Sequence, residues 1–307
     1  TFEWIVHDAF KNGYRVGIIG NSDGHKGRPG ASYPGAGWFG AIGGLTCFLM
    51  PDLSRNSLLE CINTRHHYAT TGGPSGRMRL EVSMSFDEPA TQYLDDPLLA
   101  KNCTTKPCSQ AMMGDIVLLP EGAAYLKVSV DAAAPVRSVD IFNGADHLEC
   151  HHPYEESDLG DRITVLWEGA EYRGRFRAVP WDGSAHFDKA TITSVVPVNF
   201  FNQDKKLDML SSSDLGWHSV TTGNFAGFVA KLQDSKSGSI TLKTPLINER
   251  VKLIDIGYEG KLLDASDILP RRIQMFRLPD NNLHTSVRIE RKLEPQIGRD
   301  NPFYVRI

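Results

Sequence analysis

The sequence predicts an α/β region followed by an antiparallel, Ig-like β-sandwich, and three observations lead to this fold class. Residues 1–85 alternate between helical and strand-like periodicity with short connections, which is typical of an α/β layer or barrel. Residues 119–307 hold alternating apolar runs separated by Gly, Asp and Asn, which is typical of a sandwich. The stretch 86–118 between them is polar and irregular, and it is interpreted as a linker or insertion.

The first region is expected to contain helices and strands in alternation. Apolar residues at helical spacing predict a first helix that ends at Asn12-Gly13. The apolar run 15–20 predicts a strand buried in a parallel sheet. Further elements are expected at 44–50 (strand), 54–65 (helix, with Ser57 and Glu60 spaced as a capping box) and 77–86 (strand). The sandwich strands are expected at 125–130, 139–142, 162–166, 226–232, 239–242, 250–256 and 287–289.

Composition and charge exclude two classes of protein. The formal net charge of −4, with 33 Lys and Arg against 37 Asp and Glu, disfavours a nucleic-acid binder that relies on a basic face. The sequence has no apolar run of about 18 residues or more, so no membrane span is expected. The chain begins at Thr1 without a targeting signal and ends in a strand-like run, so we expect a piece of a longer polypeptide, and the compartment stays undetermined.

The most informative motif follows the run 15–20 directly. Gly20-x-Ser22-x-Gly24 has the spacing of a hydrolase nucleophile elbow, but the glycines and prolines after it rule out the helix that such an elbow requires. The alternative is a metal site. Asp23 and His25 are alternate residues at a strand end, so they share a face, and a carboxylate with an imidazole suits Zn²⁺, Mn²⁺ or Fe. The bland alternative is an Asx-turn beside a solvated histidine.

The same motif, together with Phe39–Thr46 and the run Asn63–Gly72, resembles the DUF3604 family, which is related to the PHP (polymerase and histidinol phosphatase) metal-dependent phosphoesterases. The resemblance is tight over about 70 residues and loose elsewhere. It implies the C-terminal portion of a distorted PHP-like β/α barrel, in which Asp23 and His25 form the last ligand pair of a divalent metal centre (Zn, Mn or Fe). The upstream ligands of that family have no counterpart in this chain.

Two further residues are candidates for substrate binding. Arg65 and His67 follow the second expected helix, and either could hold an anionic substrate group; the alternative is a solvated helix end, where cations are favourable in any case. The segment 146–156 is dense in His, Cys, Asp and Glu, but its spacing matches no zinc pattern. Cys103 and Cys108 flank a polar loop and could form a disulfide in an oxidising compartment.

The sequence therefore leaves two functions open. The first is part of a metal-dependent hydrolase, phosphoesterase-like, acting on a small-molecule or phosphoester substrate, with the catalytic residues themselves unknown. The second is a non-catalytic β-sandwich protein that binds a glycan or a protein, with an inert barrel remnant. Upstream metal ligands would favour the first, because a binding module needs none.

Overall fold

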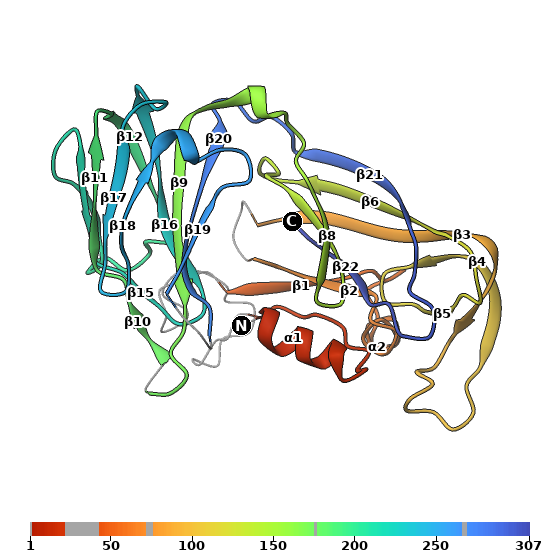
Figure 1. Cartoon of the computed structure of the whole chain (residues 1–307). Coiled ribbons are helices and arrows are strands. Elements are labelled where there is room, and N and C mark those ends of the chain that lie inside the picture. The colour runs from red at the N-terminus through yellow and green to blue at the C-terminus, as the bar shows by residue number, and fades with distance from the viewer. Residues whose placement is uncertain (1, 22–42, 72–75, 175–176, 266–268) are drawn as a thin grey trace. The chain divides into compact units, whose positions relative to one another are not determined.

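The computed structural model describes residues 2–21, 43–71, 76–174, 177–265 and 269–307 (Figure 1). Strands make up 50% of the structure and helices 8%. The described residues form two compact units. We call residues 154–282 the sandwich unit, and the described parts of 2–23, 43–153 and 283–307 the split unit. These units divide the chain at positions other than 85 and 118.

The sandwich unit is built from two five-stranded antiparallel sheets that enclose one core (Figure 1). One sheet has the order β12-β16-β9-β20-β19, and the other has the order β13-β14-β11-β17-β18. The strands of the first are β9 (Leu159–Gly169), β12 (Thr191–Val198), β16 (Phe225–Gln233), β19 (Lys261–Asp264) and β20 (Arg271–Pro279). Those of the second are β11 (Gly183–Asp188), β13 (Leu207–Met209), β14 (Asp214–Trp217), β17 (Ser239–Lys243) and β18 (Asn248–Lys252). A short pair, β10 (Val179–Pro180) and β15 (Val220–Thr221), and the 3₁₀ turns η1 (Glu156–Asp158) and η3 (Leu253–Asp255) complete the unit.

Aromatic residues fill the centre of this unit. Trp167 and Trp217 come from opposite sheets and stack with 4.8 Å between ring centroids and an interplanar angle of 13°. The indole N–H of Trp167 donates to Ser219 Oγ at 2.9 Å, and that of Trp181 donates to Thr221 Oγ1 at 2.9 Å. Each buried indole therefore keeps a hydrogen-bond partner, which removes most of the cost of burying its polar edge.

The split unit contains the two α-helices of the described residues and three antiparallel sheets. The largest sheet has the order β21-β6-β3-β4, with β5 also paired to β3. Its strands are β3 (Met78–Tyr93), β4 (Thr105–Met112), β5 (Ile116–Leu118), β6 (Ala124–Ala132) and β21 (Ser286–Leu293). The smaller sheets are β22-β7-β8 and β1-β2, built from β1 (Gly44–Phe48), β2 (His67–Thr71), β7 (Val139–Asn143), β8 (Asp146–His151) and β22 (Phe303–Arg306). The helices are α1 (Phe2–Lys11) and α2 (Arg55–Asn63).

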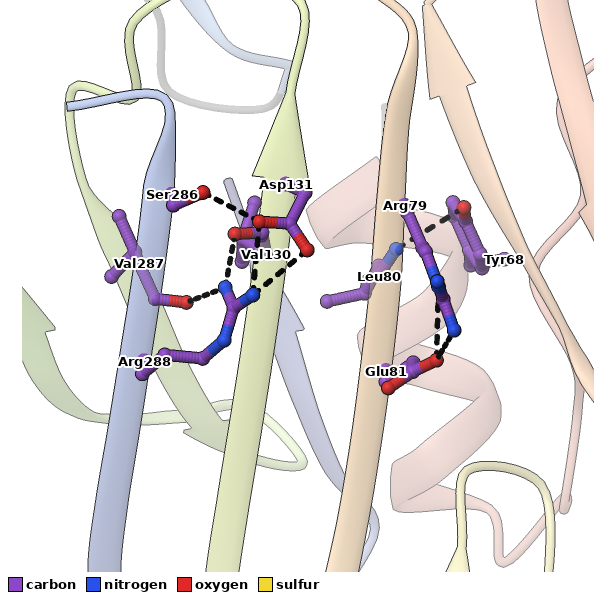
Figure 2. A network of polar contacts seen from close by, with 9 residues as sticks. All are labelled: Tyr68, Arg79, Leu80, Glu81, Val130, Asp131, Ser286, Val287 and Arg288. Atoms are coloured by element: carbon purple, nitrogen blue, oxygen red, sulfur yellow. Dashed lines mark hydrogen bonds and ion pairs between the residues drawn. The ribbon is translucent and has the colours of Figure 1, made fainter. Parts of the chain in front are cut away.

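Alternation along β3, β6 and β21 separates the two faces of the largest sheet. Leu80, Val130 and Val287 point into the core. On the opposite face, Arg288 clamps Asp131 with N–O distances of 2.8 and 2.9 Å, and Arg79 Nε donates to Glu81 at 3.0 Å (Figure 2). These ion pairs are exposed to solvent, so each contributes little to the stability of the unit. They mark this side of the sheet as its polar, solvent-facing side.

The predicted fold class is wrong, because no strands of the described residues close into a β/α barrel and the sheets are antiparallel. The order strand–helix–strand is present as β1, α2 and β2, but β1 and β2 pair antiparallel from Gly44↔Thr71 to Phe48↔His67. The bond from Leu49 N–H to His66 O, at 2.8 Å, continues this ladder. The chain around α2 thus closes like a long hairpin, whereas a barrel needs a crossover to a parallel strand.

Two local predictions also fail. The run 15–20 forms no strand, and Val16 (42% exposed) and Ile19 (60% exposed) are not buried. The stretch 86–118 is not an irregular linker, because β3 extends to Tyr93 and pairs with β4. The register of that pair shifts between Ser85 and Ala90, next to Pro89, which has no N–H for a ladder bond. Because of this irregularity the alternating pattern of β3 is interrupted after Phe86, and the sequence predicts a strand that ends there.

The predicted disulfide is absent, since Cys103 and Cys108 are both free. Leu94 N–H donates to Thr104 O at 2.9 Å and β4 starts at Thr105, so the chain between the two cysteines is extended. Five extended residue steps separate the two Cα atoms by about 16 Å, well beyond the Cα separation that a disulfide tolerates.

Other expected elements are confirmed. The first helix ends at Lys11, followed by Gly13 with φ +76°, and the second helix begins after Ser54. The N-cap is Ser54, whose side chain accepts from Ser57 N, so the predicted capping box of Ser57 and Glu60 is wrong because Ser57 lies inside the helix. The strands expected between 125 and 289 are present as antiparallel strands, except that the one expected at 250–256 ends at Lys252 and continues as η3. Those at 125–130, 139–142 and 287–289 belong to the split unit.

Candidate functional site

The two predicted metal ligands lie outside the described residues. Asp23 and His25 both fall within 22–42, so the structure describes neither side chain. It does describe the segment that leads to them, Gly17–Asn21, and the residue at which the described chain resumes beyond them, Gly43. The surroundings of the candidate site are therefore defined by these flanking residues and by Arg65, His66 and His67.

The segment Gly17–Asn21 is held against β1 and β2 by side chains. Thr46 Oγ1, on β1, accepts from Gly20 N at 3.1 Å and lies 3.0 Å from Gly20 O, to which it donates. The same hydroxyl is 3.2 Å from Asn21 Oδ1. Gly44 N donates to Asn21 O at 3.1 Å, so the described chain just before residue 22 is bonded to β1. This network fixes the backbone directly before the Asp23-x-His25 motif.

His67 fastens the start of the same segment. It is buried, and its Nδ1 lies 3.1 Å from Ile18 O, so this nitrogen carries the proton and donates. The ring packs edge-on against Phe48, with 5.7 Å between centroids. A Cβ on Gly17 would lie only 2.6 Å from the His67 ring, so glycine is required for this approach. His67 therefore acts as a brace for the backbone in this structure.

Arg65 is also occupied by backbone groups. It sits just after α2 with φ 62°, a left-handed conformation that is uncommon for arginine. Its Nε donates to Gly114 O and its Nη1 to Asn63 O, both at 3.1 Å. Burial lowers the pKa of the guanidinium, and the nearby Asp96 and Asp115 oppose this shift. The carboxylates beside Arg65 make this a poor place for an anionic substrate group.

Asp115, a carboxylate that was not among the predicted site residues, accepts hydrogen bonds from three neighbouring groups. Asp115 Oδ1 is 2.9 Å from His66 Nε2 and accepts from Gln92 Nε2 at 2.7 Å, while its Oδ2 accepts from Met112 N at 2.9 Å. Burial disfavours the charged carboxylate, but the hydrogen bonds from His66 and Met112 outweigh it and lower the pKa of Asp115. Gly114-Asp115 followed by an apolar run is the sequence signal that could have indicated this turn.

Replacing Asp115 with Asn should destabilise the split unit by about 2 kcal/mol, because at least one donor loses its acceptor in a nearly buried position. The pKa of Asp115 is lowered in the folded state, so its stabilisation is present above about pH 4 and is lost as the pH falls below that. Urea unfolding at about pH 6 and about pH 3 measures both effects. The wild-type chain should lose more stability between these two pH values than Asp115→Asn, and equal losses would contradict this assignment.

A second cluster joins three distant parts of the split unit. Arg15 Nη1 pairs with Asp96 at 3.1 Å and its Nη2 pairs with Asp300 at 3.0 Å. The pKa of Arg15 is raised: burial is the largest single influence and acts to lower it, but the hydrogen bonds and charges of these two aspartates together outweigh burial. All donors involved are committed to carboxylates of the fold, which indicates a structural cluster.

Across the residues that the structure describes, no three His, Cys, Asp or Glu side chains are grouped so that they could hold a metal ion together. The segment 146–156 is divided between separate contacts: His147 pairs with Asp140 at 2.8 Å, Cys150 faces His152 at 3.3 Å, and Glu155 and Asp158 cap η1. No helix within the described ranges is long and apolar enough to cross a membrane.

Comparisons with known proteins add no assignment. No family model, no curated protein and no solved structure matches the chain. Its function must therefore be inferred from the residues themselves.

Proposed function

We propose that this chain forms part of a metal-dependent hydrolase and that phosphoesters are its substrate class. Asp23 and His25 are the metal ligands in this proposal. The observation that carries it is the anchoring of Gly20 and Asn21 by Thr46, because a ligand pair requires a fixed backbone immediately before it. The resemblance of the motif to metal-dependent phosphoesterases supports the same class.

The donor set fits a divalent transition-metal ion. A carboxylate oxygen with an imidazole nitrogen suits Zn²⁺, Mn²⁺ or Fe. Such an ion, when bound, supplies a Lewis acid and a hydroxide at neutral pH. The described residues contribute positioning instead. Thr46 and His67 hold the segment 17–21, and His67 acts as a positioning residue and not as a substrate ligand.

Chelation tests this proposal in the complete natural polypeptide that contains these 307 residues. Hydrolysis of p-nitrophenyl phosphate should be lost after dialysis against EDTA and restored by Zn²⁺, Mn²⁺ or Fe²⁺. A chain that binds a glycan or protein without catalysis would show no hydrolysis in any of these conditions. Hydrolysis that persists in full after EDTA treatment would also exclude the proposal.

A further inference from the structure

Cys150 and His152 form a thiol–imidazole pair in the split unit. Cys150 lies on β8 opposite Asp140 of β7, and His152 follows that strand directly. The Sγ of Cys150 is 3.3 Å from Nε2 of His152. Residues 150 and 152 are alternate positions of an extended chain, so their side chains share one face.

The hydrogen bonding of His152 determines which ring nitrogen faces the sulfur as an acceptor. Nδ1 lies 3.1 Å from Arg137 O, and a carbonyl oxygen can only accept, so Nδ1 carries the proton. In the neutral ring, Nε2 then bears a lone pair directed at Cys150. His152 is buried, which holds the ring in this orientation. The structure thus presents a preformed nitrogen ligand next to a sulfur.

The surroundings keep the thiol protonated. Burial and then the charge of Asp140 raise the pKa of Cys150 to about 11, Arg137 and Ser138 act in the opposite direction, and Asp140 itself holds His147 at 2.8 Å. A protonated thiol is a poor nucleophile at neutral pH. A soft cation that replaces the proton is favoured at the same place, because its charge complements both the thiolate and Asp140.

We propose that Cys150 and His152 bind a cuprous ion, Cu(I), through Sγ and Nε2. Thiolates select soft ions such as Cu(I) and Zn²⁺, but Zn²⁺ takes about four ligands, whereas Cu(I) accepts two or three. The described residues offer two converging ligands here. In the binding step the S–H bond breaks, an S–Cu bond forms, the proton passes to solvent, and copper stays in the +1 state.

An anaerobic titration of the chain with Cu(I), in competition with the chromogenic chelator bathocuproine disulfonate, tests this site. One tightly bound equivalent is expected; Cys150→Ser should remove it, and His152→Asn should weaken it by about tenfold or more. Cys108→Ser is the matched control, since it removes another half-buried free thiol, and it should leave the tight equivalent unchanged. A tight equivalent that survives in Cys150→Ser would overturn the proposal.

Three further measurements distinguish this site from other causes of copper binding. Because one proton is released, the apparent affinity should rise by about tenfold per pH unit between about pH 7 and 9. X-ray absorption of the wild-type complex should show one sulfur and at least one nitrogen around copper, and two sulfurs would contradict the site even if Cys150→Ser failed to fold. His25→Ala should leave Cu(I) binding intact, so this inference and the proposed function fail separately.

Discussion

Replacing Arg277 with Met should destabilise the sandwich unit by about 4 kcal/mol or more, which is among the largest effects of a single substitution. Arg277 lies on β20 and is 6% exposed. Its guanidinium donates to the carbonyl oxygens of Ile256, Gly160, Ser235 and Leu253 and to Ser235 Oγ, at 2.8–3.1 Å. These acceptors belong to the start of β9, to the β16–β17 connection and to the β18–β19 connection, and the one side chain joins all three.

The reason for the large effect is geometric. Burial lowers the pKa of Arg277, and the carboxylate that opposes this, Asp161, is reached through the Ser235 hydroxyl and not directly. The side chain therefore works as a planar fork of donors for carbonyl oxygens. Arg277→Lys keeps the charge but loses the fork, so it should also be strongly destabilising.

Urea unfolding followed by tryptophan fluorescence measures this effect, since Trp167, Trp181 and Trp217 all lie in the core of the sandwich unit. Arg250→Met is the matched control. Arg250 also bonds a serine hydroxyl and a carboxylate, Ser239 at 2.7 Å and Asp188 at 2.8 Å, but it is exposed and should cost less than about 1 kcal/mol. If Arg277→Met and Arg250→Met lowered the free energy of unfolding equally, the buried guanidinium of Arg277 would not be a special source of stability.

The second large effect is expected at the proposed metal ligands. In the complete natural polypeptide, His25→Ala should reduce phosphoester hydrolysis below about a hundredth of the wild-type rate. Loss of an outer-shell partner of a metal typically costs about 10–100-fold, and loss of a direct ligand should cost more. His186→Ala is the matched control, because His186 also contacts a carboxylate, Asp214 at 2.7 Å, but lies exposed in the sandwich unit. Comparable losses in the two variants would argue against a specific role for His25.

The strands of the sandwich unit could be predicted because their period is local. Ile163, Val165 and Trp167 are spaced two residues apart along β9, and each is fully buried. The direction in which strands pair is not local. The order strand, helix, strand at 44–71 is compatible with a parallel crossover and with the antiparallel pairing seen in β1 and β2. The backbone hydrogen bonds that distinguish the two arrangements do not alter the hydrophobic periodicity of the sequence.

The candidate site shows the same limit. Arg65 and His67 are conspicuous in the sequence for their charge and position, but both donate to backbone carbonyls, at Gly114 and Ile18, which lie 49 residues away along the chain. Asp115 is inconspicuous because its partners, His66 and Gln92, come from separate elements. The spacing of residues within a segment indicates which side chains lie on the same face. It does not show which residues far away in the sequence become their hydrogen-bond partners.

The metal content of the complete natural polypeptide tests the central claim most directly. Protein purified without added metal, exchanged into chelator-treated buffer and analysed by inductively coupled plasma mass spectrometry should carry Zn, Mn or Fe. The His25→Ala and Asp23→Asn variants should lose that metal while keeping the wild-type circular dichroism spectrum. Wild-type metal content in folded His25→Ala would contradict the assignment of this residue as a ligand, and with it the proposed hydrolase.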